Sequence, residues 1–189
     1  MDDSEIRTLI DAIGRAQQRY ESLAFDEEHP HALGAPASNE AIRSLEARLG
    51  SLLPRDYRVF LRLHNGWQNF HADGKLLAVE DQDSEWVKKK IKFWSDLWNS
   101  EDPNPFTRGA VPIMLGESLH HFLVLDPTRV GPDGGAHIVE YDSMYEQKVY
   151  DSFTEYLRNE LNVLKGLIER ELHGMPDEDD QNALRGDQT

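Results

Sequence analysis

Hydrophobic residues recur at the helical period in several stretches near the start of the chain. Over residues 4–24 they stand three or four positions apart, which predicts an amphipathic helix. A second such stretch follows Ser38, a residue suited to capping a helix, and stops at Gly50, which can leave a helix without steric cost. The intervening residues 25–38 contain proline and glycine and are predicted to form a loop or linker.

The best-delimited helix is predicted within residues 53–67, LPRDYRVFLRLHNGW. Pro54 suits the first helical position because its missing N–H would have no partner there, and Gly66 is predicted to end the helix. Side chains three, four and seven positions apart form one apolar face, made of Tyr57, Phe60, Leu61 and His64.

Beyond this helix the pattern changes to short runs typical of β-strands, at residues 76–79, 111–115, 122–125 and 137–141. Residues 126–135, DPTRVGPDGG, combine proline, glycine and aspartate as a loop between antiparallel strands requires. We therefore expect a small, largely antiparallel sheet.

Two more helices complete the predicted fold. Residues 85–99 have a broad apolar face and a lysine-rich outer face. Ser152 and Glu155 have the spacing of a capping box, which predicts the start of a last helix that ends near Gly174. The predicted fold class is α+β, with a helical N-terminal region, a small sheet with helices covering one face, and a closing C-terminal helix.

The predicted organisation has three parts. Residues 1–35 form an N-terminal helix and linker, and residues 36–174 form the core domain. The acidic residues 175–189 have no core-forming period and are predicted to be a disordered tail.

The charge of the chain narrows its range of partners. Its 189 residues carry 35 acidic and 20 basic side chains, a formal net charge of −15. Such a surface repels phosphate backbones, so we expect no direct nucleic-acid ligand, whereas a basic protein would be attracted. The alternative is that the acidic surface only keeps the protein soluble.

Features that are missing from the sequence narrow the expected cellular compartment and the chemistry of the protein. No cysteine occurs, the N-terminus is acidic, unlike a signal peptide, and no apolar window reaches membrane-spanning length, so we expect a cytoplasmic protein. His120 and His121 are adjacent in a predicted strand and would point to opposite faces, which disfavours a shared metal ion. Gly116-Glu117-Ser118 lacks the second glycine of a nucleophile elbow. We expect no metal, no cofactor and no enzymatic activity.

Several short motifs follow one another in order across residues 36–165. The first comprises Leu53, Pro54, Tyr57, Leu61, Asn65 and Gly66; Pro112 follows in VPIM and Asp126 in FLVLDP. HIVEYD begins at His137, and SFTEYL begins at Ser152. This order resembles the SUKH superfamily, whose members include bacterial immunity proteins and a yeast cell-wall-synthesis regulator.

The resemblance implies an immunity protein, a monomer or weak dimer, that binds a cognate polymorphic or contact-dependent bacterial toxin and occludes its active surface. If the toxin is a basic nuclease, the net charge of the chain suits mimicry of a phosphate backbone. The alternative is a regulatory or scaffold domain that resembles the yeast regulator.

One acidic stretch is the candidate partner-binding site. Its carboxylates stand near aromatic residues that could anchor a basic protein, and the predicted site consists of Trp67, Phe70, Asp73, Glu80, Asp81, Asp83 and Glu85. Trp86 lies beside this stretch. The alternative is that the tryptophans belong to the core and the acids only solvate a loop.

Overall fold

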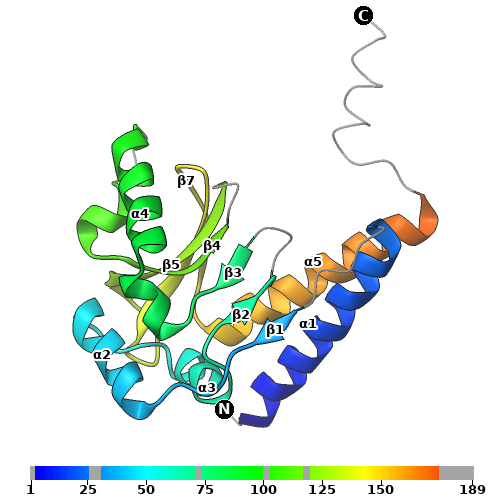
Figure 1. Cartoon of the computed structure of the whole chain (residues 1–189), viewed down its shortest axis with the longest axis horizontal. Coiled ribbons are helices and arrows are strands. Elements are labelled where there is room, and N and C mark those ends of the chain that lie inside the picture. The colour runs from blue at the N-terminus through cyan, green and yellow to red at the C-terminus, as the bar shows by residue number, and fades with distance from the viewer. Residues whose placement is uncertain (1–2, 26–30, 71–73, 100–102, 117–119, 175–189) are drawn as a thin grey trace, which may run out of the picture.

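The computed structural model describes residues 3–25, 31–70, 74–99, 103–116 and 120–174. The predicted disordered tail, residues 175–189, lies outside the described residues. Within the described residues, seven antiparallel strands form one sheet in which each strand pairs with the next along the chain (Figure 1). This arrangement, with helices at both ends of the described chain, confirms the predicted α+β class.

The helices are α1 (Asp3–Ala24), α2 (Asn39–Leu49), α3 (Arg55–Leu63), α4 (Glu85–Leu97) and α5 (Phe153–His173), with the 3₁₀-helices η1 (Val79–Asp83) and η2 (Pro105–Arg108). The strands are β1 (Ala32–Leu33), β2 (Trp67–Gln68), β3 (Gly74–Leu76), β4 (Val111–Gly116), β5 (His121–Val130), β6 (Ala136–Asp142) and β7 (Tyr145–Tyr150).

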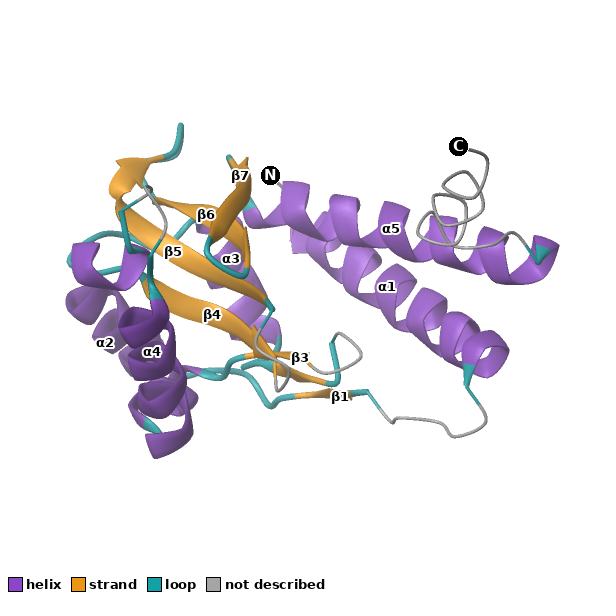
Figure 2. Cartoon of the chain, turned by 90° about the horizontal axis from the view of Figure 1, so that it is seen from above, coloured by secondary structure: helices purple, strands orange, loops and turns teal. Residues whose placement is uncertain are grey.

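Helices cover both faces of the sheet, and the expectation of one covered face is wrong. Side chains alternate along β5, so that Leu123 and Leu125 join a core beneath α1, α3 and α5, while Phe122 and Val124 join a second core with α4 and η2. Figure 2 shows α4 across the sheet from α1 and α5. All six residues of β4 are buried, as expected for a strand that is covered on both sides.

The capping residues in the sequence correctly predicted where α2 and α5 begin. Ser38 accepts a hydrogen bond from the backbone N–H of Ala41 at 3.1 Å, and Gly50 ends α2 with a φ of +68°. Ser152 caps α5 by accepting from the N–H of Glu155 at 3.1 Å. The return bond of the predicted capping box is made one residue early, because the Glu155 carboxylate accepts from the N–H of Asp151.

Other boundaries differ from the predictions. The helix expected to stop at Gly66 ends at Leu63, and Gly66 instead adopts a φ of +90° in the turn before β2. The strand expected at residues 76–79 ends at Leu76, and η1 follows. Strands β1, β2 and β7 had no distinct sequence signal.

A buried carboxylate connects α3 to α5. Asp56 is 5% exposed, and its Oδ2 accepts from the backbone N–H of Thr154 at 2.6 Å while its Oδ1 accepts from the N–H of Tyr57 at 2.9 Å. Both donors lie in the first turns of their helices, where backbone N–H groups have no partner within the helix. Around this contact the ring of Phe153 packs 4.9 Å from that of Tyr57 and 5.0 Å from that of Phe60, between centroids.

We expect Asp56→Ala to lower the free energy of unfolding by about 1–3 kcal/mol, because it leaves two buried helix-terminal N–H groups unpaired. Urea denaturation measures the change. The exposed Asp11 of α1 provides a control, since Asp11→Ala should stay within about 0.5 kcal/mol of the wild type. Equal effects of the two substitutions would contradict a special role for Asp56.

Buried tyrosines make the fold sensitive to alkaline pH. Burial raises the pKa of Tyr57 and Tyr156 above the usual value of 10, and burial together with the hydrogen bond to Glu140 raises the pKa of Tyr150. The unfolded chain therefore loses these protons first. The stability that these protonated tyrosines contribute to the folded state is complete below pH 10 and is lost as the pH rises above it.

We expect the free energy of unfolding to fall above pH 10 by up to about 1.4 kcal/mol per pH unit for each of these tyrosines. Urea denaturation at a series of pH values measures the slope. Tyr57→Phe should make the slope shallower by one tyrosine's share, whereas Tyr145→Phe, at a side chain that is 61% exposed, should leave it unchanged. A slope that is the same in all three proteins would refute this explanation.

Candidate partner-binding surface

The predicted acidic stretch forms η1 and the first turn of α4. Glu80, Asp83 and Glu85 are exposed there, and Asp81 is half-buried. Asp73 lies outside the described residues. Four of the five predicted acids thus lie in one continuous segment, residues 80–85, which is called the acidic surface below.

Each of these acids contacts a polar or basic neighbour. Asp83 Oδ1 lies 2.8 Å from Arg48 Nη1 of α2, and Glu85 Oε1 lies 3.0 Å from Lys88 Nζ. The side chains of the two acids are 78% and 80% exposed. Ion pairs in this setting contribute about 0–1 kcal/mol, so a basic partner could replace Arg48 or Lys88 at little cost.

Asp81 differs from its neighbours because it stabilises its own helix. Its Oδ2 accepts from the backbone N–H of Ala78 at 3.0 Å and lies 3.2 Å from Lys75 Nζ. Substitution of Asp81 would therefore disturb the 3₁₀-helix as well as the surface charge.

The Asn65-Gly66 motif holds η1 in place. Asn65 Oδ1 accepts from the backbone N–H of Val79 at 2.8 Å, and Asn65 Nδ2 donates to Glu80 Oε2 at 2.5 Å. A Cβ on Gly66 would lie 2.8 Å from the backbone nitrogen of Ala78, so this position requires glycine for space as well as for its positive φ. The motif that carries the resemblance is therefore a structural support beneath the acids.

The same support continues into the sheet. Gln82, which is 8% exposed, donates from Nε2 to the backbone carbonyl of Pro112 at 2.5 Å. Pro112 flanks an irregularity in the β4–β5 register, where its carbonyl remains available. The 3₁₀-helix is thus attached both to the end of α3 and to β4.

The expectation that Trp67 and Phe70 are exposed anchors is wrong. Their exposed fractions are 1% and 2%, and their rings pack with centroids 5.1 Å apart inside the core. Helix α1 covers Trp67, since a Cβ on Gly14 would lie 3.9 Å from the indole ring. The structure therefore supports the core alternative for Trp67, and Phe70 is also a core residue.

Trp86 is the aromatic residue that reaches this surface. It is half-buried, and the Nζ atoms of Lys75 and Lys90 lie 5.0 and 5.6 Å from the centre of its ring. These contacts are cation–π interactions, which an arginine or lysine of a partner could also make.

The remaining motif residues are internal. Leu53, Pro54, Tyr57 and Leu61 are buried. Asp126 is fully buried, and its Oδ1 accepts from the N–H and the hydroxyl of Thr128, while its Oδ2 lies 3.3 Å from Arg108 Nη2. Asp126 therefore neutralises an arginine and stabilises the part of β5 where its register with β6 shifts, between Asp126 and Val130.

Sequence reasoning did not identify Asp133 as a cap of α3. Its Oδ2 accepts from the backbone N–H of Arg55 at 2.7 Å, and its Oδ1 accepts from the N–H of Gly135 at 2.9 Å. Pro54, the residue before α3, has no side chain able to accept a hydrogen bond from the first N–H groups of the helix. A proline at this position is therefore a sequence signal that another residue caps α3.

Among the described residues, no group of three or more histidine, cysteine or acidic side chains could hold a metal ion. His121 pairs with Glu140, with Nε2 and Oε1 2.6 Å apart. No helix within the described ranges has both the length and the apolar character needed to cross a membrane.

Comparison with known proteins gives one family. The model of the SMI1 / KNR4 family (SUKH-1) matches residues 36–159. No curated protein sequence matches the chain. The match begins just before α2 and ends within α5, so it contains the acidic surface and the whole sheet except β1.

We expect Gly66→Ala to lower the free energy of unfolding by at least about 1 kcal/mol more than Gly50→Ala. Both glycines have a positive φ, but a Cβ at Gly50 would meet no atom within 4 Å, whereas one at Gly66 would press on Ala78. Urea denaturation of the two variants measures the difference. Equal losses would mean that Gly66 is required only for its dihedral angle.

Proposed function

The chain belongs to the SMI1 / KNR4 family (SUKH-1), and from this membership we propose that it is an immunity protein for a cognate polymorphic or contact-dependent toxin. The family match over residues 36–159 is the observation that carries the proposal. In this role the protein binds the toxin in the cytoplasm, as a monomer or weak dimer, and occludes the toxin's active surface without chemistry of its own.

Charge supports a basic toxin as the partner. The net charge of −15 would accelerate association with a cationic protein, and the solvated carboxylates of Asp83 and Glu85 provide contacts whose existing ion pairs exchange easily. If the toxin is a nuclease, these carboxylates would stand in for the phosphate groups of its substrate.

The second candidate is a regulatory or scaffold domain that binds a cellular protein, as the yeast regulator's membership of the superfamily suggests. It predicts a stable complex whose loss changes growth or cell-wall synthesis. It does not predict protection from a toxin. The two functions are therefore separable in one experiment.

The test is capture of partners by the tagged full-length protein in its native cells, followed by co-expression with the captured protein in a host that lacks both. We expect the captured protein to arrest growth alone and growth to recover when the chain is present. A captured protein that is harmless to the host would favour the regulatory function, and failure of any partner to co-purify would contradict both candidates.

We expect the double charge reversal Asp83→Lys and Glu85→Lys to weaken binding of the captured protein by about tenfold or more, mainly through slower association. Glu169→Lys with Glu171→Lys is the matched control, because both residues are exposed on α5 and the net charge changes equally. Surface plasmon resonance at two ionic strengths measures the rates. Equal weakening by both pairs would show that only the total charge matters and would remove the acidic surface as the interface.

A further inference from the structure

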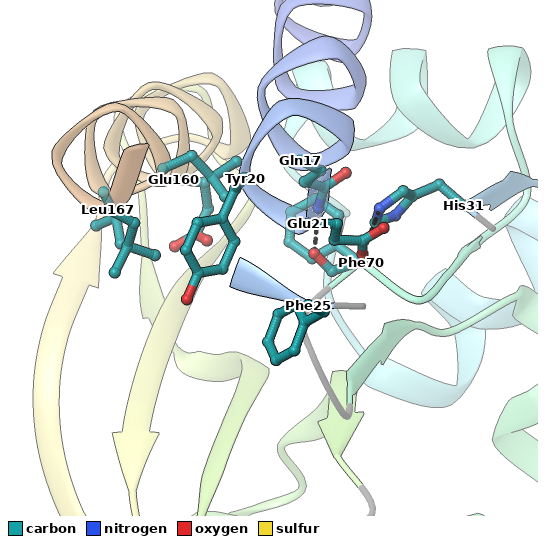
Figure 3. A pocket seen from close by; sticks show the side chains of 10 residues that line it. Gln17, Tyr20, Glu21, Phe25, His31, Phe70, Glu160 and Leu167 are labelled. Atoms are coloured by element: carbon teal, nitrogen blue, oxygen red, sulfur yellow. Dashed lines mark hydrogen bonds and ion pairs between the residues drawn. The ribbon is translucent and has the colours of Figure 1, made fainter. Parts of the chain in front are cut away.

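Helices α1 and α5 lie side by side and extend together beyond the sheet (Figures 1 and 2). Glu5 of α1 and Arg158 of α5 form an ion pair across their contact. Toward the end of α1, the two helices enclose a cavity of about 170 Å³ together with His31 and Phe70 (Figure 3).

This cavity belongs almost entirely to parts of the chain outside the family match. Its lining from α1 and His31 precedes residue 36, and its lining from α5 begins at Glu160, after the match ends at residue 159. Of the described lining residues, Phe70 alone lies within the match. The cavity is therefore a feature that this chain adds to the family core.

Hydrogen-bond acceptors and negative charge dominate the polar lining. Glu160 is 5% exposed, and Glu21 Oε1 lies 2.9 Å from His31 Nε2. Among the described residues, no lysine or arginine lines the cavity. Gln17, at 4% exposure, donates from Nε2 to the carbonyl of Phe70, and its Oε1 has no hydrogen-bond partner among the described residues. A buried acceptor without a donor is costly, and a ligand N–H group would satisfy it.

Aromatic and aliphatic side chains form the rest of the wall. The rings of Tyr20 and Phe25 meet edge to face with centroids 6.0 Å apart, and Phe70 also lines the cavity. Leu164 and Leu167 of α5 complete an apolar side. Figure 3 shows Glu160 and Leu167 on one side of Tyr20 and the Glu21–His31 pair on the other.

We propose that this cavity binds a small organic cation with an apolar stem, of the alkylguanidinium or alkylammonium type. Carboxylates and the Gln17 carbonyl accept hydrogen bonds from the cationic head, aromatic faces attract its charge, and the leucines contact its stem. An apolar cavity of about 150 Å³ holds a benzene-sized molecule, so the volume of about 170 Å³ suits a ligand of similar size. This inference requires no toxin and stands apart from the proposed function.

The test is isothermal titration calorimetry of the full-length protein with n-butylguanidinium and with its neutral isostere n-butylurea. We expect n-butylguanidinium to bind at least about tenfold tighter, because hydrogen bonds to a charged donor are stronger than neutral ones. Equal affinity for the two compounds, or no binding of n-butylguanidinium, would overturn the proposal.

Two variants locate the binding. Glu160→Gln should remove most of the preference for the guanidinium, whereas Glu169→Gln, exposed on the same helix, should retain it. Leu167→Trp fills the cavity and should weaken the binding of both compounds. Leu172→Trp is its control, because this side chain is 53% exposed. Circular dichroism verifies that each variant is folded. Loss of binding in the control variants to the same degree would place the cation elsewhere and refute the assignment.

One further titration separates the two sources of such a cation. N-acetyl-arginine amide presents the same head on a peptide unit, as a protein partner would. Binding of this compound as tight as that of n-butylguanidinium would assign the cavity to an arginine side chain. Binding of n-butylguanidinium alone would assign it to a free small molecule.

Discussion

The architecture depends on the buried carboxylate of Asp56. A charged group at 5% exposure is tolerated only where hydrogen bonds replace its lost hydration, and here the first turns of α3 and α5 provide N–H donors. The contact spans 98 residues and sets the start of α5 relative to α3. Because α1 packs along α5, the position of the N-terminal helix also depends on it.

From α3 the same constraint extends to the acidic surface. Asn65 follows the end of α3 and binds the first residues of η1, and Gln82 attaches η1 to β4. The backbone of the acidic segment is therefore fixed while Asp83 and Glu85 stay solvated. A fixed segment with solvated, weakly paired carboxylates is well suited to association steered by charge, since little backbone order has to be gained on binding.

The chain also divides into a family core and additions that flank it. The matched region supplies the acidic surface and the sheet except β1, while α1 and residues 160–173 of α5 lie outside it. These additions cover Trp67 and Phe70, which would otherwise be large apolar groups at the edge of the core. They also create the acceptor-rich cavity, so one packing event both completes the core and forms a second site.

The sequence by itself determined the features that neighbouring residues decide. The periods of α1, α2, α4 and α5, the caps at Ser38 and Ser152, and three of the four longer strands, β4, β5 and β6, all follow from side chains within a few positions. The motif order also located the family correctly. The acids of η1 were found because they are adjacent in the chain.

Only the tertiary structure decided what depends on distant partners. The two-residue strands β1 and β2 exist because each pairs with its neighbour, and α3 is capped by Asp133, 78 residues away. Trp67 is buried because α1, more than 40 residues earlier in the chain, packs over it, which no local pattern around Trp67 reveals. Burial and long-range hydrogen bonding are properties of the assembled fold. The local sequence around an aromatic residue beside acids is therefore the same whether that residue ends in the core or at the surface.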